Sequence, residues 1–379
     1  MIIAYCTFEV DNVVRGTDTY AYTLISAIAK IDDKNVYHIF TNKADKYNKI
    51  CNKPNFFVHL IKMNENDIST INDVEKKRIS ADVLWMNTVL FSAIEQYKFN
   101  VVHCLGYYGP LVNKSKTNVK IILTAHGLEH IFVPEMFQQH HIIFLKQYLE
   151  KAYQQCDHII TPAYYTREKL NEIYKIDLSK ITAIHHGISD RYFVSLEQKK
   201  TMPETPYLLF VSFLEKRKNL KGTLLAYKKY LEYDKQGCKL VVIGGGYEDY
   251  LDLVRENGIE KQVVFKGQVS FDTLLDYYKN AILFIFTSYY EGFGFVLAEA
   301  MAAGLPIVCA NNSAIPEIVE DAAILVENDS DQIAKTILEM INNVELREKL
   351  AKNSILRAEN FREKYMAQKH IRVYEELVR

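Results

Sequence analysis

The sequence has no long hydrophobic run and no grouped cysteines. No apolar stretch approaches the roughly 18 residues that a membrane-spanning helix needs. The first residues form a short strand-like run without the charged and apolar regions of a signal peptide. We therefore expect a cytoplasmic protein. No pair of cysteines has metal-ligand or redox-motif spacing, so we expect small core residues in a reducing compartment. The six are Cys6, Cys51, Cys104, Cys156, Cys238 and Cys309.

An excess of charge is also absent. The 46 lysines and arginines almost balance the 47 aspartates and glutamates, giving a net charge of −1. Such a chain has no surplus of cations with which to displace the counterions of a phosphate backbone, so we do not expect a nucleic-acid partner. Proline is scarce as well, and Pro203 and Pro206 close the polar stretch 187–206. This stretch is the best candidate for a linker.

The length of 379 residues predicts two domains rather than one core. Strand-like and helix-like segments alternate on both sides of the linker, as in doubly wound α/β domains. The strands expected before it are 2–8, 36–41, 56–61, 101–104, 120–125, 158–161 and 181–185. Those expected after it are 208–212, 239–243, 262–266, 282–286, 306–309 and 323–326.

One stretch, residues 290–308, joins glycines to carboxylates. Gly292 and Gly294 follow the strand at 282–286 and precede a short helix, so the backbone can approach a ligand there. The helix start offers amide groups and a positive dipole end, which suit a diphosphate. Glu291 and Glu299 frame the site and would repel a phosphate unless each holds a hydrogen-bond donor. Sugar hydroxyls on both sides of the diphosphate of a nucleotide sugar meet that need.

Glu291-Gly-Phe-Gly-Phe, a second glutamate, Glu299, separated from Glu291 by seven residues, and the helix ending in Gly304-Leu-Pro306 resemble the signature of the GT-B-fold retaining glycosyltransferases of family 4. A Rossmann-type turn with solvated glutamates is the alternative. The resemblance implies two Rossmann-like doubly wound domains with a cleft between them. It also implies attack by the acceptor on the face that the nucleotide leaves, with the phosphate oxygen taking the proton. We expect an acceptor-binding domain at 1–190, a donor-binding domain at 207–355 and a final helix, 356–379, that crosses back.

Three cations follow the strand at 208–212, where α/β proteins bind ligands. In the family an Arg-Lys-Asn-like step there stabilises the charge on the leaving nucleotide, so the resemblance assigns a catalytic role to Arg217 and Lys218. Lys216 is expected to be solvated. The family often has Gly, sometimes with Arg, where this chain has Ser212 and Phe213, so any contact from that arginine is missing.

The resemblance also implies different roles for the two glutamates. Glu291 is expected to face the transferred sugar and to take part in catalysis, and Glu299 to accept hydrogen bonds from the ribose hydroxyls. They lie on either side of a loop and a helical turn, unlike the close carboxyl pair of a retaining glycosidase. Gly244 belongs to a triplet that is either a tight turn or a nucleotide contact. The other substrate-binding candidates are Gly292, Phe293, Gly294, Phe295 and Ser288.

Two places in the first half resemble family positions. Gly16 lies in a loop before the first helix, where phosphate or acceptor would approach, although only Gly16 and Tyr20 match the family pattern. His126 follows the strand at 120–125 and matches a family His-Asp step in which Gly127 replaces the Asp. We expect His126 to hydrogen-bond the donor sugar, with a structural role as the alternative. His103 matches another family histidine and is read as structural.

No metal or other cofactor is expected, because Lys218 and a helix N-terminus can neutralise the diphosphate. Asp329-Ser330-Asp331 has the Asp-x-Asp form that binds metal in another glycosyltransferase fold. It precedes a helical pattern, so helix capping explains it better. His140 and His141 are adjacent, do not share a helix face and have no third ligand beside them.

Basic and aromatic residues suggest a peripheral membrane contact. Lys76-Lys77-Arg78 leads a helix expected at 74–97, and residues 138–153 form a second amphipathic run. These helices could bring a lipid-linked acceptor to an anionic membrane face, or their apolar stripes could simply face the core.

The sequence thus predicts a retaining hexosyltransferase that uses a nucleotide sugar, GDP-mannose or a UDP-hexose, and a saccharide or lipid-linked acceptor. A GT-B nucleotide-sugar epimerase and a catalytically silent nucleotide-sugar-binding protein are the alternatives.

Overall fold

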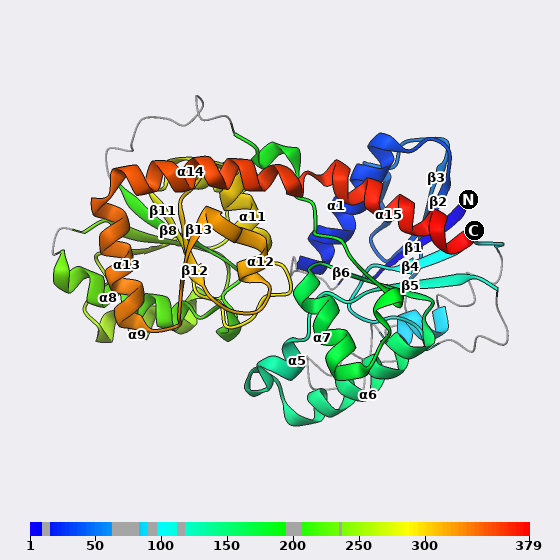
Figure 1. Ribbon diagram of the computed structural model, residues 1–379, viewed down its shortest axis with the longest axis horizontal. Coiled ribbons are helices and arrows are strands. Elements are labelled where there is room, and N and C mark those ends of the chain that lie inside the picture. Colours follow the sequence, from blue (N-terminus) through cyan, green and yellow to red (C-terminus); the bar gives the residue numbers. More distant parts are fainter. Residues whose placement is uncertain (10–15, 63–82, 90–96, 112–117, 195–205, 235–236) are drawn as a thin grey trace. The chain divides into compact units, whose positions relative to one another are not determined.

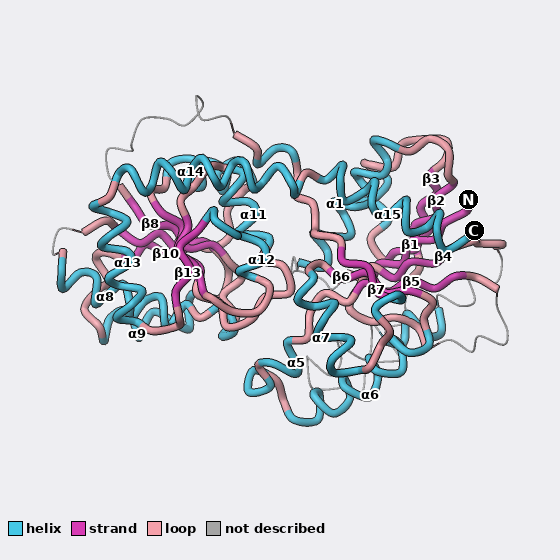
Figure 2. Tube along the Cα trace, in the orientation of Figure 1, coloured by secondary structure: helices cyan, strands magenta, loops and turns pink. Residues whose placement is uncertain are grey.

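The computed structural model describes residues 1–9, 16–62, 83–89, 97–111, 118–194, 206–234 and 237–379. The chain divides into two compact units (Figure 1). The first unit consists of Met1–Gly187 and Glu363–Arg379, and the second of Ile188–Arg362. Each unit is an α/β layer structure with its own parallel sheet, as the alternating pattern predicted (Figure 2).

The first unit is built on a seven-stranded parallel sheet with the order β3-β2-β1-β4-β5-β6-β7. The central strands β1 and β4 are buried along nearly their whole length. Because helices cover both faces of such a parallel sheet, its central strands consist of short and mostly apolar runs. The strands are β1 Ile2–Thr7, β2 Val36–Thr41, β3 Phe56–Leu60, β4 Val101–Cys104, β5 Lys120–Thr124, β6 His158–Thr161 and β7 Ile181–Ala183.

The first unit contains helices from both ends of the chain. Helix α1 packs against the last helix, α15, and Lys30 forms an ion pair with Glu363 between them. Within the described residues, the other helices are connections between strands. Among the residues that the structure describes, the α-helices of this unit are α1 Gly16–Ile31, α2 Ala44–Asn48, α5 Glu129–Phe132, α6 Gln139–Gln155, α7 Tyr164–Tyr174 and α15 Glu363–Val378.

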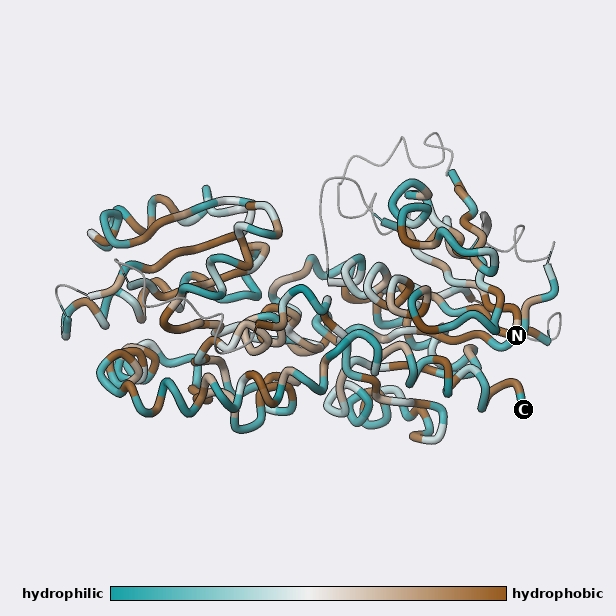
Figure 3. Tube along the Cα trace, turned by 90° about the horizontal axis from the view of Figure 1, so that it is seen from above, coloured by the Kyte–Doolittle hydropathy of each residue, from teal (hydrophilic) through white to brown (hydrophobic). Residues whose placement is uncertain are grey.

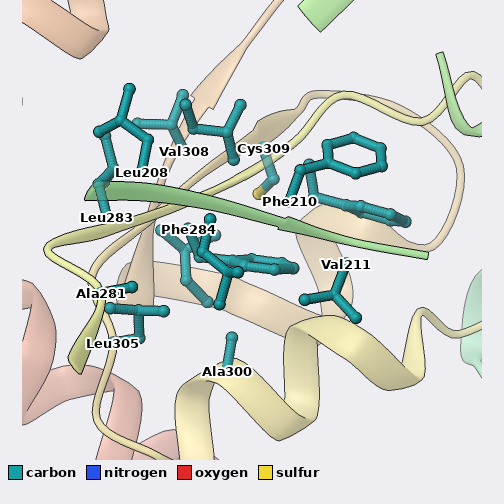
Figure 4. Packing of buried hydrophobic residues seen from close by; sticks show 14 of the residues in the cluster. Leu208, Phe210, Val211, Ala281, Leu283, Phe284, Ala300, Leu305, Val308 and Cys309 are labelled. Atoms are coloured by element: carbon teal, nitrogen blue, oxygen red, sulfur yellow. The ribbon is translucent and has the colours of Figure 1, made fainter. Parts of the chain in front are cut away.

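The second unit has a six-stranded parallel sheet with the order β10-β9-β8-β11-β12-β13. Its core lies where β8, β11 and β12 meet helix α11 (Phe295–Ala302), and Ala300 of that helix points toward Phe284 of the sheet (Figure 4). The strands are β8 Tyr207–Val211, β9 Lys239–Ile243, β10 Val263–Phe265, β11 Leu283–Phe286, β12 Ile307–Ala310 and β13 Ala323–Val326.

Several helices of the second unit carry hydrophobic and hydrophilic residues within the same turn, as helices with one face on a core do (Figure 3). Asp329 caps α13 by accepting hydrogen bonds from the amides of Asp331 and Gln332, at 3.1 and 2.8 Å. This confirms the capping interpretation of the Asp-x-Asp sequence. The α-helices are α8 Leu220–Tyr233, α9 Leu251–Glu256, α10 Phe271–Asn280, α11 Phe295–Ala302, α12 Ile315–Val319, α13 Ser330–Asn342 and α14 Val344–Ala358.

The boundaries differ from the predicted ones in two places. The described part of the expected linker, 187–194, is packed: Ile188 donates its amide to the carbonyl of Phe361, and Val194 to that of Ala302, at 2.8 and 3.1 Å. Residues 356–362 stay with the second unit, because α14 continues to Ala358 and a 3-10 turn follows, so the final segment begins at Glu363 rather than at 356. The remainder of the linker, 195–205, lies outside the described residues.

The two predicted membrane-contact segments have different outcomes. Lys76–Arg78 lies outside the described residues, and 85–89 is a π-helical turn. In α6, Leu145, Tyr148 and Leu149 are buried, so most of the apolar stripe faces the core, whereas Ile143 and Phe144 are exposed. Among the described helices, none is long and apolar enough to span a bilayer.

Candidate active site

The candidate site of the second unit lies at the carboxyl ends of β8 and β11, which are neighbours in the sheet. The 3-10 turn Lys216–Lys218 follows β8, and the glycine loop follows β11. The two loops are joined directly, since the amide of Tyr289 and the hydroxyl of Ser288 both donate to the carbonyl of Arg217, at 2.9 and 3.1 Å. Residues more than seventy positions apart thereby form one surface at the sheet edge.

The centre of this surface is an ion cluster. Lys218 Nζ lies 2.7 Å from Oε1 of Glu291, and Arg217 Nη1 lies 3.3 Å from the same oxygen. Glu291 is only 5% exposed, and burial alone would raise the pKa of its carboxyl. The two cations instead hold that pKa below its ordinary value. Burial and Arg217 lower the pKa of the Lys218 ammonium, although Glu291 opposes the shift.

Asn219 fixes the cationic turn in place. Its backbone adopts the left-handed conformation with φ 56°, which ends the turn and begins α8. Its side-chain oxygen accepts from the amide of Gly222 at 3.0 Å, capping the helix. Its side-chain amide donates to the carbonyl of Thr287 at 3.0 Å, on the strand side of the other loop. One side chain therefore sets the distance between Lys218 and the glycine loop.

The glycine loop leads straight into α11. Gly294 is the N-cap residue with φ 90°, and a Cβ there would lie 3.0 Å from Leu297, so glycine suits this position for conformation and for space. The amide of Glu291 donates to Ser313 Oγ at 2.9 Å, which holds the start of the loop. Phe293 packs against Phe361 and Phe295 in the core. Gly292, Gly294 and Phe295 thus place the positive end of α11 next to the ion cluster.

Glu299 lies on α11 and is 8% exposed. Its Oε2 accepts a hydrogen bond from Tyr278 of α10 at 3.0 Å, and the Tyr192 hydroxyl also donates to this carboxyl. Burial raises the pKa of Glu299 to about 7, although the two tyrosine hydroxyls act to lower it. Both tyrosines are partners that the sequence patterns did not point out.

Two predicted contacts have internal roles in this structure. The Ser288 hydroxyl is fully buried and donates to the carbonyls of Arg217 and Tyr290, so it joins the loops. Gly244 has φ 140°, and a Cβ there would lie 1.6 Å from the carbonyl oxygen of Ser212. The close approach of the β8 and β9 ends therefore accounts for this glycine, as the tight-turn interpretation requires.

The predicted residues of the first unit lie at the starts and ends of its elements. Gly16 is the first residue of α1 and is exposed, whereas Arg15 lies outside the described residues. His126 follows β5, and its Nε2 lies 2.8 Å from the carbonyl oxygen of Leu105. Burial lowers the pKa of His126 to about 4, so the ring is neutral near pH 7. Because a carbonyl only accepts, Nε2 carries the proton and Nδ1 is left as an acceptor.

The other histidines considered in the sequence are His103, His140 and His141. His103 is completely buried and bonded at 2.8 Å to both Thr124 and Tyr374, which agrees with its structural interpretation. In α6, His140 is exposed and His141 is buried. Within the described residues, no group of three or more His, Cys, Asp or Glu side chains is arranged to hold a metal ion.

Comparison with known proteins identifies two family models that match this chain. A family model described as "Glycosyl transferases group 1" matches residues 195–357, and one described as "Glycosyltransferase Family 4" matches residues 14–192. The chain is 26% identical over 280 residues to the Escherichia coli O-antigen chain mannosyltransferase B, covering 71% of this chain and 72% of that protein.

Solved structures show the same fold. Sucrose-phosphate synthase from Thermosynechococcus elongatus superposes with a TM-score of 0.79 at 19% identity, covering 99% of this chain and 98% of the other. Anabaena Alr3699/HepE, solved in complex with UDP-glucose, gives a TM-score of 0.72 at 15% identity, with 99% and 100% coverage. The predicted GT-B fold is therefore confirmed, and the chain belongs to the GT-B glycosyltransferases of the group 1 and family 4 type.

Proposed function

We propose that this glycosyltransferase moves a hexose from a nucleotide sugar to a hydroxyl of a saccharide or lipid-linked acceptor, with retention of configuration and without a metal. The observation that carries the proposal is the cluster of Arg217, Lys218 and Glu291 beside the start of α11. Two cations, one carboxylate and a helix N-terminus sum to a positive site, which suits a diphosphate.

Donor binding would redistribute the partners of this cluster. The diphosphate oxygens compete with Glu291 for Lys218 and Arg217, because charge-assisted bonds to phosphate are at least as favourable as those to a carboxylate. Glu291 can then accept a hydrogen bond from a hydroxyl of the transferred sugar. The same two cations stabilise the charge that develops on the leaving nucleotide.

The reaction itself needs no protein nucleophile in this proposal. The acceptor oxygen bonds to the anomeric carbon as the bond from that carbon to the phosphate oxygen breaks. The acceptor proton passes to the departing phosphate oxygen on the same face, so the anomeric configuration is retained. Glu299 receives the ribose hydroxyls, and Nδ1 of His126 accepts from a hydroxyl of the transferred sugar.

The relatives support a hexose and a glycan acceptor but differ in donor. One is named as a mannosyltransferase of O-antigen chains, and one was solved with UDP-glucose. We propose GDP-mannose first and a UDP-hexose second. Peripheral membrane contact through the exposed Ile143 and Phe144 of α6 would suit a lipid-linked acceptor.

The test is nucleotide release from UDP-, GDP-, ADP- and dTDP-sugars without acceptor, comparing the wild type with Glu291→Ala. Slow hydrolysis of one donor, lost in the variant, is the expected result. Isomerised nucleotide sugar would instead indicate an epimerase, and affinity without turnover even when acceptors are added would indicate a silent binder. Hydrolysis that persists in Glu291→Ala would contradict the assigned site.

A further inference from the structure

Glu291 is held by the loop after β12 as well as by the ion cluster. In the sheet, β11 lies between β8 and β12, so the loop 311–314 after β12 lies on the side of the glycine loop that faces away from β8. The amide of Glu291 donates to Ser313 Oγ at 2.9 Å, and its carbonyl accepts from the amide of Ala314 at 3.3 Å. The ion pair with Lys218 therefore holds the side chain of Glu291, and the loop 311–314 holds its backbone.

Asn312 and Ser313 bridge the two ends of the turn that carries Glu291. The carbonyl of Ser288 and the amide of Glu291 are three residues apart, the spacing that the hydrogen bond of a β-turn joins. In this structure the link passes through two side chains. Asn312 Nδ2 donates to the Ser288 carbonyl at 3.0 Å, and Asn312 Oδ1 accepts from Ser313 Oγ at 2.9 Å. The same Oγ accepts from the Glu291 amide, so a chain of three hydrogen bonds fixes both ends of the turn.

The backbone of Ser313 is strained where it forms this bridge. Its φ is 50°, in the left-handed region that is unfavourable for residues with a Cβ. Glycine would adopt this conformation readily, but it has no hydroxyl with which to accept from Glu291 and donate to Asn312. Strained residues cluster at active sites and ligand clamps, where the surrounding structure holds them in place. The serine at position 313 therefore indicates that its hydroxyl is needed there.

The proposed redistribution of the ion cluster gives this bridge a role. When a diphosphate takes over Lys218 and Arg217, the Glu291 carboxylate loses the two cations that hold it. The hydrogen bonds to the backbone of Glu291 do not involve those cations, so they can keep the carboxylate directed at the transferred sugar. Turnover is sensitive to such positioning, because a displacement of about 1 Å can cost about a hundredfold in rate.

We infer that Ser313, supported by Asn312, is a positioning residue that keeps Glu291 in place once the diphosphate has drawn the two cations away. The inference rests on the proposed transferase function. Neither Ser313 nor Asn312 has to touch the donor, since both act through Glu291. The consequence is that loss of the Ser313 hydroxyl should lower turnover without lowering the affinity for the diphosphate.

The experiment separates the hydroxyl of Ser313 from the strain of its backbone. Ser313→Ala removes the hydroxyl and keeps the unfavourable conformation, whereas Ser313→Gly removes both. Lys175→Gly is the matched control, because Lys175 also has a left-handed backbone, with φ 55°, but lies at the end of α7 in the first unit. Thermal unfolding, hydrolysis of the active donor without acceptor, and calorimetric binding of free GDP and UDP are measured for each protein.

Both Ser313 variants should lower the kcat of hydrolysis by about tenfold or more, and to the same extent, because both lack the hydroxyl. Their affinity for free diphosphate should stay close to that of the wild type, since Lys218 and Arg217 are unchanged. Ser313→Gly should nevertheless unfold at a higher temperature than Ser313→Ala, because only glycine relieves the strained conformation. Asn312→Ala leaves Ser313 able to accept from Glu291 and should lose less rate. Lys175→Gly should keep the wild-type rate.

Wild-type rates in both Ser313 variants would overturn the inference. A rate that follows stability, with Ser313→Gly markedly faster than Ser313→Ala, would also overturn it, because a merely structural role predicts that order. If Ser313→Ala does not fold, Ser313→Gly decides by its rate and its diphosphate affinity.

A fall in diphosphate affinity as large as the fall in kcat would count against the inference too, since Ser313 would then act on the phosphate contacts rather than through the Glu291 carboxylate. Absence of turnover in the wild type with every donor would contradict the proposed function, and the inference with it. The other contrary results leave the proposed function standing, so the two failures are distinguishable.

Discussion

Lys218 Nζ donates to Oε1 of Glu291 across a 2.7 Å contact that spans 73 residues of sequence. The pair joins the turn after β8 to the glycine loop after β11, and Arg217 shares the same carboxylate oxygen. The proposed phosphate-binding cations and the proposed sugar-binding carboxylate are therefore paired with one another in the structure. This mutual dependence leads to the first prediction.

Replacement of Glu291 by alanine should lower the unfolding free energy by more than the loss of the packing of its side chain alone would. Glu291→Ala leaves the largely buried Lys218 without its carboxylate, whereas Arg217 keeps Glu215 at 3.4 Å, and breaking a buried pair in this way costs about 3–5 kcal/mol in comparable proteins. The double variant Lys218→Ala/Glu291→Ala should lose clearly less than the sum of the two single variants. Urea unfolding of the four proteins measures this coupling. Additive losses would mean that the contact contributes nothing.

Donor affinity should depend on pH through Glu299. An ionised carboxylate can accept two ribose hydroxyls, whereas the protonated form offers fewer acceptor sites. Because the pKa is raised to about 7, affinity should increase as the pH rises through that value. Tyr278→Phe removes a hydrogen bond that lowers the pKa, so it should move the midpoint to higher pH. Nucleotide binding followed by calorimetry over this range gives both midpoints. If the midpoint of the pH dependence of affinity is the same in Tyr278→Phe as in the wild type, Glu299 is not the group that causes this dependence.

The carboxyl of Glu299 should also make stability depend on pH, but in the opposite direction: stability should fall, rather than rise, as the pH increases. The folded pKa of about 7 exceeds the reference value of 4.5, so the native state binds more protons than the unfolded state between these values. The contribution of Glu299 to stability is then present below about pH 4.5 and is lost as the pH rises to about 7. Glu299→Gln should make the unfolding free energy flatter over this interval, which denaturant titrations at several pH values can measure. An unchanged slope would contradict the raised pKa.

Replacement of His126 should affect turnover rather than nucleotide affinity. His126→Ala removes the Nδ1 acceptor and should lower kcat/KM about tenfold, the size of a hydrogen bond within a binding site. Affinity for the free nucleoside diphosphate should stay unchanged. His126→Asn can place an oxygen near the Nδ1 position and should recover part of the rate. Since burial lowers the pKa to about 4, the wild-type rate should show no titration of this histidine between roughly pH 5 and 8. Full activity in His126→Ala would show that the residue is only structural.

Gly244 should prove to be a structural glycine. A methyl group there would collide with the carbonyl oxygen of Ser212, and φ 140° is itself unfavourable for alanine. Gly244→Ala should therefore lower the unfolding free energy by several kcal/mol, that is, more than the roughly 1 kcal/mol of a left-handed alanine. Gly246→Ala is the matched control, because a Cβ there would meet no atom closer than 3.8 Å. Thermal unfolding of both variants compares them. If the two variants lose the same unfolding free energy, the close contact with the Ser212 carbonyl is not the reason that position 244 requires glycine.

The strands could be predicted from the sequence because a parallel strand that is buried on both faces is a short apolar run, as at Val101–Cys104 and Lys239–Ile243. The placement of Glu291 and Lys218 at one sheet edge could also be expected, since both follow strands. Their direct contact could not, because it depends on how Asn219 and Ser288 join the two loops.

Other parts of the site leave no local signal. Tyr278 is 21 residues from Glu299, and their contact forms only because the folded chain brings the tyrosine side chain of α10 to the carboxylate of α11. Tyr192 falls within a stretch that its polar composition identified as a linker. The two carbonyl partners of Ser288, those of Arg217 and Tyr290, also follow from the turn geometry and leave no sign in the sequence.

The assignment of the ion cluster as the diphosphate site is tested most directly by the binding of free GDP and UDP. Calorimetry at one salt concentration should compare the wild type with Lys218→Ala and Lys216→Ala. Lys216 and Lys218 belong to the same turn, but only Lys218 contacts Glu291 in the structure described here. If the ion cluster binds the diphosphate, Lys218→Ala should lose about tenfold or more in affinity, whereas Lys216→Ala should stay close to the wild type. Equal losses in the two variants, or no diphosphate binding by the wild type, would contradict the assignment of the donor site.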